Sequence, residues 1–296
     1  MISILIPTYN YNVVPLVKAL QGQIHLSQIN YEIKVYDDGS TDLPEENEKL
    51  PAFQNTIYKK LEKNIGRTAI RNLMATEAKY EWLLFLDADV LPDTIEFLEH
   101  YTNAIKNNDY DVVSGGIIYD EIKPSQKQLL RWHYGREREA KSVDERNIEP
   151  YFIFSSNLLI KKQLFLEANT VLENYYGLDN SLSNQLKKMN AKVLHIDNPV
   201  VHFGLEENEE FIKKALKAVE TTVILENKGL MDTNMRPLQK SYSKLKKLHL
   251  QHVFSAIISK FKKDMERNFM SEKPNLFWFD LYRLDYYIQL KKKHNA

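Results

Sequence analysis

Short apolar runs alternate with segments of helical periodicity over the first 120 residues of the chain. The apolar runs predict strands at residues 2–6, 31–36, 56–61, 82–86 and 111–119. The segments between them predict amphipathic helices at residues 13–24, 67–78 and 94–106. Strands that alternate with helices indicate βαβ units, and therefore an α/β fold with a mostly parallel sheet covered by helices on both faces.

The rest of the chain is irregular at first and helical afterwards. Short strands are expected at residues 149–154, 158–160, 192–195 and 200–203, and helices at residues 126–141, 163–168 and 181–189. Long helical patterns follow at residues 207–227, 240–268 and 276–292. This change of character predicts one domain over residues 1–230 and a helical C-terminal extension over residues 231–296.

Polar clusters directly follow three of the predicted strands. They are Thr8-Tyr9-Asn10, Asp37-Asp38-Gly39-Ser40 and Asp87-Ala88-Asp89. Because parallel strands bring their carboxyl ends to one edge of a sheet, these clusters would line one crevice. Alternation along a strand lets Asp87 and Asp89 project the same way, and two carboxylates suit a Mg²⁺ or Mn²⁺ ion that carries a diphosphate.

Each cluster also has a simpler interpretation. Residues 8–10 could begin a helix, and residues 37–40 or 87–89 could form ordinary solvated turns. Their coincidence at one edge favours a ligand site. Thr8 and Tyr9 offer hydroxyl groups and an aromatic face that suit a nucleobase, and Asp38 can accept a hydrogen bond from a base N–H.

Four sequence blocks together resemble the family 2 glycosyltransferases, which have the GT-A fold. The blocks are ILIPTYN at 4–10, VYDDGSTD at 35–42, NIGR at 64–67 and DAD at 87–89, and weaker similarity continues to about residue 210. The resemblance implies a GT-A catalytic domain over residues 1–230 and an inverting enzyme of hexosyltransferase type. Such an enzyme moves a sugar from a nucleotide-diphospho-sugar, here a UDP-sugar, to a hydroxyl of a glycan or lipid-linked acceptor. A divalent cation, Mn²⁺ or Mg²⁺, and a role in surface or capsular polysaccharide synthesis are implied as well.

The resemblance also implies roles for residues at the strand ends. Thr8, Tyr9 and Asp38 would hold the nucleoside, Asp87 would approach the ribose or the donor sugar, and Asp89 would bind the metal. Arg67 and Arg71 stand one helical turn apart where the family contacts the base or the donor. A guanidinium makes directed hydrogen bonds to such groups, although an ion pair or packing against Asp87 is an equally simple role.

The resemblance implies that Asp179 is the catalytic base. In the family this base is the Asp of a Glu-Asp pair, about six residues before a polar-Leu pair; here Gln185-Leu186 stands at that distance, and Leu178 replaces the usual Glu. A carboxylate within reach of the acceptor hydroxyl can take its proton in the transition state. Capping of the helix that follows is the alternative role for Asp179.

Three further residues are candidates for ligand contacts. His202 lies in VVHFGLE at 200–206, and relatives with this pattern use the histidine as a second metal ligand, which imidazole chemistry permits. The alternative is a structural histidine at a strand end, and His195 is expected in a strand core. Asn157 resembles a residue that borders the donor sugar, and Trp132 could stack on a sugar face or lie buried in a charged helix.

The composition of the chain bears on its binding partners and on its location in the cell. Forty basic residues balance forty acidic ones, which does not favour a nucleic-acid partner. The chain has no cysteine, no signal-peptide pattern and no apolar run of membrane-spanning length, so we expect a cytoplasmic protein. Aromatic residues near Lys291-Lys292-Lys293 could bring the C-terminal helices to the inner membrane face as a peripheral contact. Packing of these helices on their own domain, or on the second subunit of a homodimer, is the alternative.

Two other activities compete with sugar transfer. A nucleotidyltransferase of related topology would carry a Gly-rich basic phosphate loop near its start, whereas residues 7–15 contain no Gly, Lys or Arg. A non-catalytic nucleotide-sugar-binding module would have no need of Asp179 and His202, both of which are present. The sequence therefore favours a glycosyltransferase over both.

Overall fold

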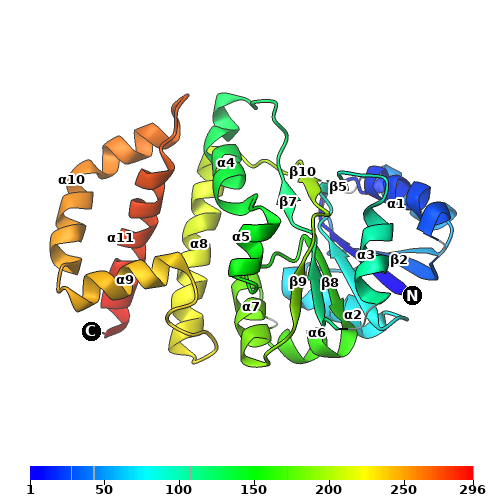
Figure 1. Cartoon of the computed structure of the whole chain (residues 1–296). Coiled ribbons are helices and arrows are strands. Elements are labelled where there is room, and N and C mark those ends of the chain that lie inside the picture. The colour runs from blue at the N-terminus through cyan, green and yellow to red at the C-terminus, as the bar shows by residue number, and fades with distance from the viewer. Residues whose placement is uncertain (28, 43, 107–108, 172, 296) are drawn as a thin grey trace. The chain divides into compact units, whose positions relative to one another are not determined.

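The computed structural model describes residues 1–27, 29–42, 44–106, 109–171 and 173–295. The chain divides into two compact units (Figure 1). The first comprises Met1–Asp120, Glu139–Asn174 and Gln185–Gly204, and the second comprises Glu121–Arg138, Tyr175–Asn184 and Leu205–Ala296. These units are defined by packing, and the expected boundary between a catalytic domain and an extension at residue 230 remains a prediction.

A seven-stranded sheet forms the centre of the first unit, in the order β3-β2-β1-β4-β8-β6-β9. Its strands are β1 (Ile2–Thr8), β2 (Tyr31–Asp37), β3 (Thr56–Lys60), β4 (Trp82–Leu86), β6 (Val112–Ser114), β8 (Asn157–Lys161) and β9 (Val193–His195). Neighbours are parallel except β8, which is antiparallel to both β4 and β6. Every residue of β4 is buried, as a strand covered on both faces requires. The predicted α/β class with a mostly parallel sheet is confirmed.

Two pairs of helices pack beside this sheet. Helix α1 (Val14–Ser27) contacts α3 (Phe97–Lys106), and α2 (Arg67–Glu77) contacts α6 (Lys162–Ala168). The connections from β1 to β2 and from β3 to β4 cross the sheet in opposite directions, so right-handed crossovers put α1 and α2 on opposite faces. The strand order reverses between β1 and β4, and open α/β sheets bind ligands at the carboxyl ends of such strands.

A small second sheet was not predicted from the sequence. It consists of β5 (Val90–Pro92), β10 (Val200–His202) and β7 (Ile117–Ile118), in that order. The strand predicted over 111–119 was wrong as a single element, because the chain bends between β6 and β7. Gly116 has φ +86° there, and a Cβ on it would lie 2.8 Å from the Arg146 guanidinium.

The remaining elements of the first unit are a 3₁₀ helix, η1 (Glu45–Ala52), and the short helix α5 (Val143–Ile148). The strand predicted at residues 149–154 is absent from the structure as described, and these residues form turns and irregular backbone. Pro150 has no N–H for a strand ladder, and its carbonyl accepts a hydrogen bond from His195 instead.

The second unit is helical. It contains η2 (Gln126–Gln128), α4 (Leu129–Tyr134), α8 (Asn208–Asn227), α9 (Pro237–Lys247), α10 (Gln251–Phe269) and α11 (Leu276–Asn295). A π-helical turn, η3 (Gly135–Glu139), and helix α7 (Asp179–Lys188) cross between the two units. The single helix predicted over 240–268 was wrong, because His249 adopts φ 56° and separates α9 from α10.

The core of the second unit is aromatic and aliphatic. Its buried members are Leu130, Phe211, Ile258, Met265, Phe269, Leu276 and Phe279. Among the described residues, none of the helices combines the length and the apolar character that crossing a membrane requires.

Candidate functional site

The loop after β1 is fastened to the loop after β2. The side-chain carbonyl of Asn10 accepts hydrogen bonds from the backbone N–H groups of Thr41 (3.0 Å) and Asp42 (3.1 Å), and the Asn10 N–H donates to Ser40 Oγ (2.7 Å). Asn10 has φ 50°, a conformation that asparagine tolerates. Tyr9 on this loop is 45% exposed. The loop is therefore tied down by Asn10, and the Tyr9 ring is half exposed, as a stacking ligand would require.

Thr8 and Asp38 lie buried at the ends of β1 and β2. The Thr8 hydroxyl donates to the carbonyl of Tyr11 (3.1 Å), and the two Asp38 carboxylate oxygens accept from the N–H groups of Ile65 (2.8 Å) and Gly66 (3.0 Å). Burial raises the pKa of Asp38; the two backbone hydrogen bonds lower it, and the net direction is upward. Asp38 thus braces the NIGR loop, and its remaining lone pairs are what a nucleobase could use.

Gly66 in the NIGR loop meets a steric requirement. Its φ is +94°, and a Cβ at this position would lie 2.6 Å from the side chain of Asn174. Helix α2 begins at the next residue, so this turn sets the direction in which α2 presents Arg67 and Arg71.

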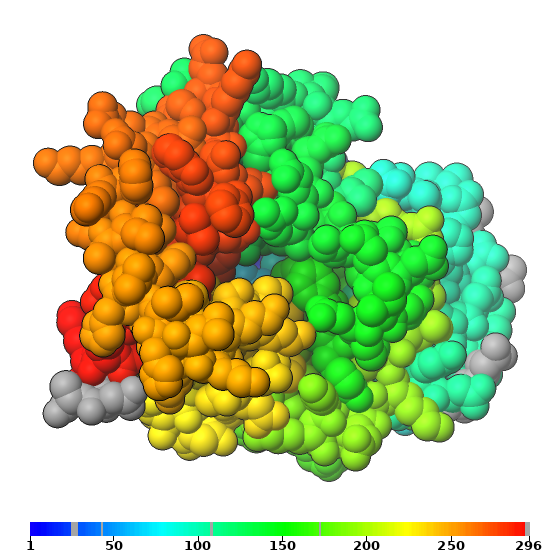
Figure 2. Space-filling view, turned by 60° about the vertical axis from the view of Figure 1, so that its left-hand side comes forward, coloured from blue at the N-terminus to red at the C-terminus, as the bar shows by residue number. Residues whose placement is uncertain are grey.

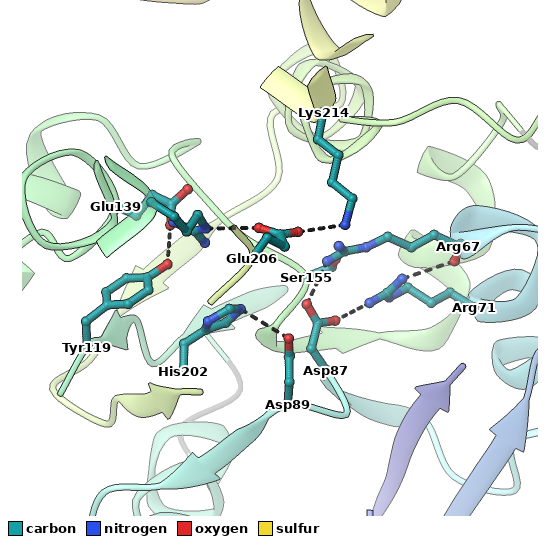
Figure 3. A network of polar contacts seen from close by, with 11 residues as sticks. Arg67, Arg71, Asp87, Asp89, Tyr119, Glu139, Ser155, His202, Glu206 and Lys214 are labelled. Atoms are coloured by element: carbon teal, nitrogen blue, oxygen red, sulfur yellow. Dashed lines mark hydrogen bonds and ion pairs between the residues drawn. The ribbon is translucent and has the colours of Figure 1, made fainter. Parts of the chain in front are cut away.

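Asp87 is held by both arginines (Figure 3). Arg67 Nη2 donates to Asp87 Oδ2 at 2.7 Å, and Arg71 Nη2 donates to the other oxygen. Burial by itself raises the pKa of Asp87, but the Arg67 and Arg71 charges outweigh it, and the net shift is downward. Asp87 is therefore ionised at neutral pH, and packing against Asp87 is a role that both arginines fulfil.

The two arginines differ in the exposure of their side chains. The Arg71 side chain is 5% exposed, whereas that of Arg67 is 47% exposed. Arg67 also donates to Ser155 Oγ at 3.3 Å. The Arg67 side chain is thus half exposed, while that of Arg71 is buried.

Asp89 and His202 face each other across the small sheet (Figure 3). His202 pairs with Val90 in the antiparallel ladder of β10 and β5, which brings its Nε2 to 3.5 Å from Asp89 Oδ2. The His202 ring also tilts against Tyr119, with ring centroids 5.4 Å apart. Gly204 completes the arrangement, because a Cβ there would overlap the Asp89 carboxylate. One carboxylate oxygen and one imidazole nitrogen thus face each other.

The imidazole rings of His195 and His202 differ in their hydrogen bonds. His195 is a buried strand-core residue, as predicted: its Nδ1 lies 3.1 Å from Arg146 Nη1 and its Nε2 lies 2.8 Å from the Pro150 carbonyl. In contrast, His202 Nδ1 is buried and has no hydrogen-bond partner within the described part of the chain. A structural histidine normally has both nitrogens satisfied, and His202 lacks that second hydrogen bond, while its Nε2 faces Asp89.

Asp89 and His202 fit a divalent cation that a ligand helps to hold. No group of three or more His, Cys, Asp or Glu side chains among the described residues could hold a metal by itself. A carboxylate and an imidazole suit Mn²⁺, and the remaining positions of its coordination shell would belong to phosphate oxygens and water. The metal-binding role of Asp89 and His202 thus remains a prediction, which the 3.5 Å approach of the two side chains supports.

Asn157 is fully engaged by the protein. It begins β8, donates to the carbonyls of Gly116 (2.7 Å) and Asn198 (2.9 Å), and accepts from the Tyr101 hydroxyl (2.6 Å). Both N–H groups of its amide are used in these bonds. A sugar contact by Asn157 thus remains a prediction, which these hydrogen bonds do not favour. Ser155, two residues earlier in the chain, accepts a hydrogen bond from Arg67.

Asp179 and Trp132 belong to the second unit. Asp179 is the first residue of α7, and the adjacent Leu178, which replaces the usual Glu, is buried. Trp132 lies in α4 with the Arg136 guanidinium 4.9 Å from the centre of its ring. The roles of Asp179 as base and of Trp132 as a stacking residue remain predictions.

Three further positions received no role from the sequence. Gly204 lies in the VVHFGLE block, and this position in the motif is the sequence feature that could have indicated its importance. Tyr119 packs on His202 and donates a hydrogen bond to Glu139, a pairing that no local pattern indicates. In the second unit, Glu206 accepts a hydrogen bond from Lys214 at 2.7 Å (Figure 3). The other Glu206 carboxylate oxygen lies 3.4 Å from Arg131 Nε.

Comparison with known proteins agrees with this architecture. The family model described as Glycosyl transferase family 2 matches residues 3–167, which is more than half of the chain. Mannosyltransferase PcManGT from Pyrobaculum calidifontis, solved with GDP-Man and Mn²⁺, is similar in structure at 14% identity and a TM-score of 0.58, with coverage of 100% of this chain and 88% of that one.

Structures of S. aureus TarS are similar as well. TarS 1–349 in complex with UDP-GlcNAc has 17% identity and a TM-score of 0.53, with coverage of 99% of this chain and 91% of that one. Against a longer TarS chain, the alignment has 19% identity and a TM-score of 0.48 and covers 75% of this chain, which spans only 39% of that protein. At 14% and 17% identity, the likeness to PcManGT and to TarS 1–349 shows a shared GT-A fold.

Proposed function

The chain belongs to glycosyl transferase family 2, and we propose that it is an inverting, metal-dependent enzyme that uses a nucleotide-diphospho-sugar, in the first place a UDP-sugar. The observation that carries this proposal is the pairing of Asp89 with His202 at 3.5 Å, with one imidazole nitrogen left unbonded. These two groups would hold Mn²⁺ or Mg²⁺ at the end of β4, next to the ionised Asp87.

The donor would lie along the carboxyl ends of β1, β2 and β4. The exposed ring of Tyr9 would stack on the base, and Asp38 would accept from a base N–H beside Thr8. Asp87 would accept hydrogen bonds from ribose or sugar hydroxyls, because its negative charge is maintained by two guanidinium groups. The exposed edge of Arg67 would contact the donor as well.

Transfer would occur by direct displacement. Asp179 takes the proton from the acceptor hydroxyl as that oxygen forms a bond to C1 of the donor sugar, and the bond from C1 to the diphosphate oxygen breaks with inversion. The nucleoside diphosphate leaves with the electron pair of the broken bond. A bound divalent cation would offset the charge that develops on this leaving group. The acceptor would be a glycan or a lipid-linked saccharide, in polysaccharide synthesis.

A thermal-shift titration with nucleotides tests the proposal. UDP, GDP and their sugars are added with Mn²⁺, with Mg²⁺ or with EDTA, to the full chain and to His202→Ala. We expect stabilisation by UDP that depends on Mn²⁺ and is lost in the variant, because half of the protein ligands to the metal are gone. Metal-independent binding that is equal in both proteins would contradict the metal site. Tight donor binding without any release of nucleoside diphosphate in the presence of acceptor extracts would indicate a non-catalytic module.

A further inference from the structure

A strongly basic segment occupies one part of the second unit. Residues 233–263 contain eight Lys and Arg and no Asp or Glu, although the net charge of the whole chain is zero. The eight are Arg236, Lys240, Lys244, Lys246, Lys247, Lys260, Lys262 and Lys263. This segment covers α9 and most of α10, which we name the α9–α10 arm, and Figure 2 shows it in orange at the surface of its unit.

The same arm exposes apolar side chains. Val253, Ile257 and Phe261 are 56%, 51% and 50% exposed, and their four-residue spacing aligns them along one side of α10. Leu248 and Leu250 in the turn before α10 are 63% and 42% exposed. The core side of α10 is formed by other residues, among them Ile258 and Met265. Helix α10 thus has a second apolar side that its own unit does not cover.

Lysines surround this apolar stripe. Lys260 lies one turn after Ile257, and Lys244, Lys246 and Lys247 are exposed at the end of α9. In the described part of the chain, no carboxylate forms an ion pair with any of these four lysines. Lysine stems can lie along an apolar surface while their ammonium groups reach outward. The arm therefore combines the positive charge of these four lysines with exposed hydrophobic area.

The aromatic C-terminal helix, by contrast, is used within its unit. Phe279 and Tyr287 of α11 are buried, and Tyr282 donates to Glu266 at 2.9 Å. Lys291 forms an ion pair with the buried Glu226 at 3.0 Å. Packing of α11 on its own domain, which the sequence left open as an alternative, is what the structure shows. The membrane contact expected from aromatic residues near the C-terminus remains a prediction, and the contacts of these three aromatic side chains do not favour it.

We propose that the α9–α10 arm docks on an anionic lipid membrane, with Val253, Ile257 and Phe261 entering the boundary between headgroups and acyl chains. Apolar residues flanked by lysines suit that boundary, and each lysine near an anionic surface strengthens the attachment. A nucleic acid would use the positive charge but leave the apolar stripe unexplained. A symmetric pair of arms would bring like charges together, which disfavours a second copy of the chain. This proposal does not depend on the donor or the metal.

Vesicle flotation tests the proposal with the full chain. Vesicles of phosphatidylcholine with 30% phosphatidylglycerol are compared with pure phosphatidylcholine, at low salt and at about 0.5 M NaCl. We expect binding to the anionic vesicles at low salt, weakened about tenfold by high salt and by neutral lipid. The triple variant Val253→Ser, Ile257→Ser, Phe261→Ser should lose at least tenfold in partitioning. The matched control is Ile57→Ser, Ile95→Ser, Ile148→Ser, which removes residues that are 47%, 66% and 80% exposed in the first unit.

A charge series completes the test. Lys244→Gln, Lys246→Gln, Lys247→Gln should reduce binding about tenfold or more, whereas Lys49→Gln, Lys187→Gln, Lys217→Gln, at exposed sites outside the arm, should not. Circular dichroism melts verify that every variant is folded. Flotation of the serine variant like the wild type overturns the proposal. So does a wild-type dimer in sedimentation that becomes monomeric in the serine variant, or oligonucleotide binding that displaces vesicles and survives in that variant.

Discussion

Gly204 lies so close to Asp89 that any side chain at residue 204 would overlap the Asp89 carboxylate. The neighbouring Phe203 N–H also donates to the Asp89 carbonyl at 2.9 Å. The segment that carries His202 therefore holds the backbone of Asp89 and leaves room for its side chain. Asp89 can therefore keep its position only because residue 204, two residues after His202, has no side chain.

Substitution of Gly204 should impair the metal site more than the fold. Gly204→Ala displaces Asp89 or the backbone beside it, at a cost of about 1–3 kcal/mol in unfolding free energy. We expect a larger relative loss in Mn²⁺-dependent nucleotide binding, measured by thermal shift. Gly22→Ala is the matched control, because no atom lies within 4 Å of the added Cβ and α1 gains a better helix former. Unchanged Mn²⁺ dependence in Gly204→Ala would contradict the placement of the metal.

Removal of the Asp87 charge should destabilise the protein through Arg71. Asp87→Asn leaves the Arg71 guanidinium, 5% exposed, without its anionic partner, and we expect a loss of about 3 kcal/mol in urea unfolding. Arg67→Ala should cost about 1 kcal/mol or less, since that side chain is 47% exposed, yet weaken donor binding. Equal loss of stability in both variants would contradict the assignment of a stabilising role to Arg71 and a donor-binding role to Arg67.

The stability of the fold should depend on pH through His195. Burial lowers the pKa of His195 to about 4, the Pro150 hydrogen bond opposes this, and the Arg146 charge adds to it. The unfolded chain has the ordinary value of about 6.5. Between these two values the unfolded state binds a proton that the folded state does not, so the unfolding free energy falls as pH falls, by up to about 3 kcal/mol. Urea unfolding from pH 7 to about pH 4 measures this slope.

A variant isolates the contribution of His195 to that slope. His195→Gln should unfold more easily at pH 7, because the hydrogen bonds to Arg146 and Pro150 are altered, but its stability should decline less steeply below about pH 6.5. His252→Gln changes an exposed histidine of α10 and should leave the slope as it is. A slope in His195→Gln as steep as in the wild type would assign the pH dependence to other groups.

Asp179→Asn separates chemistry from binding. We expect transfer to fall by a factor of about 10²–10⁴, since general-base assistance is lost, with donor affinity nearly unchanged. Nucleoside diphosphate release and calorimetry measure the two quantities. Asp144→Asn is the control for a carboxylate in the first turn of a helix, because Asp144 stands there in α5. Transfer by Asp179→Asn at the wild-type rate would show that Asp179 serves only to begin α7.

Local sequence patterns were sufficient to predict the bounds of a strand where that strand is buried on both faces. Residues 82–86 are a continuous apolar run and form β4 with the predicted bounds, since a strand in the centre of this sheet is covered on both faces. The helical extension was also evident, but its interruption was not: His249 takes a left-handed conformation that no periodicity shows. Likewise, the lack of space for a side chain at Gly116 is due to the buried Arg146, which lies thirty residues away in the chain.

The sequence by itself determined the order of strands and helices along the first hundred residues and the acidic and polar residues that end each strand. Those features follow from local periodicity and from motifs of contiguous residues. Only the tertiary structure decided that β8 runs antiparallel between β4 and β6, and that Asp87 is paired with two arginines while Asp89 faces His202. Pairings of this kind join residues far apart in the chain, and their energies depend on burial and distance, which exist only once the chain has folded.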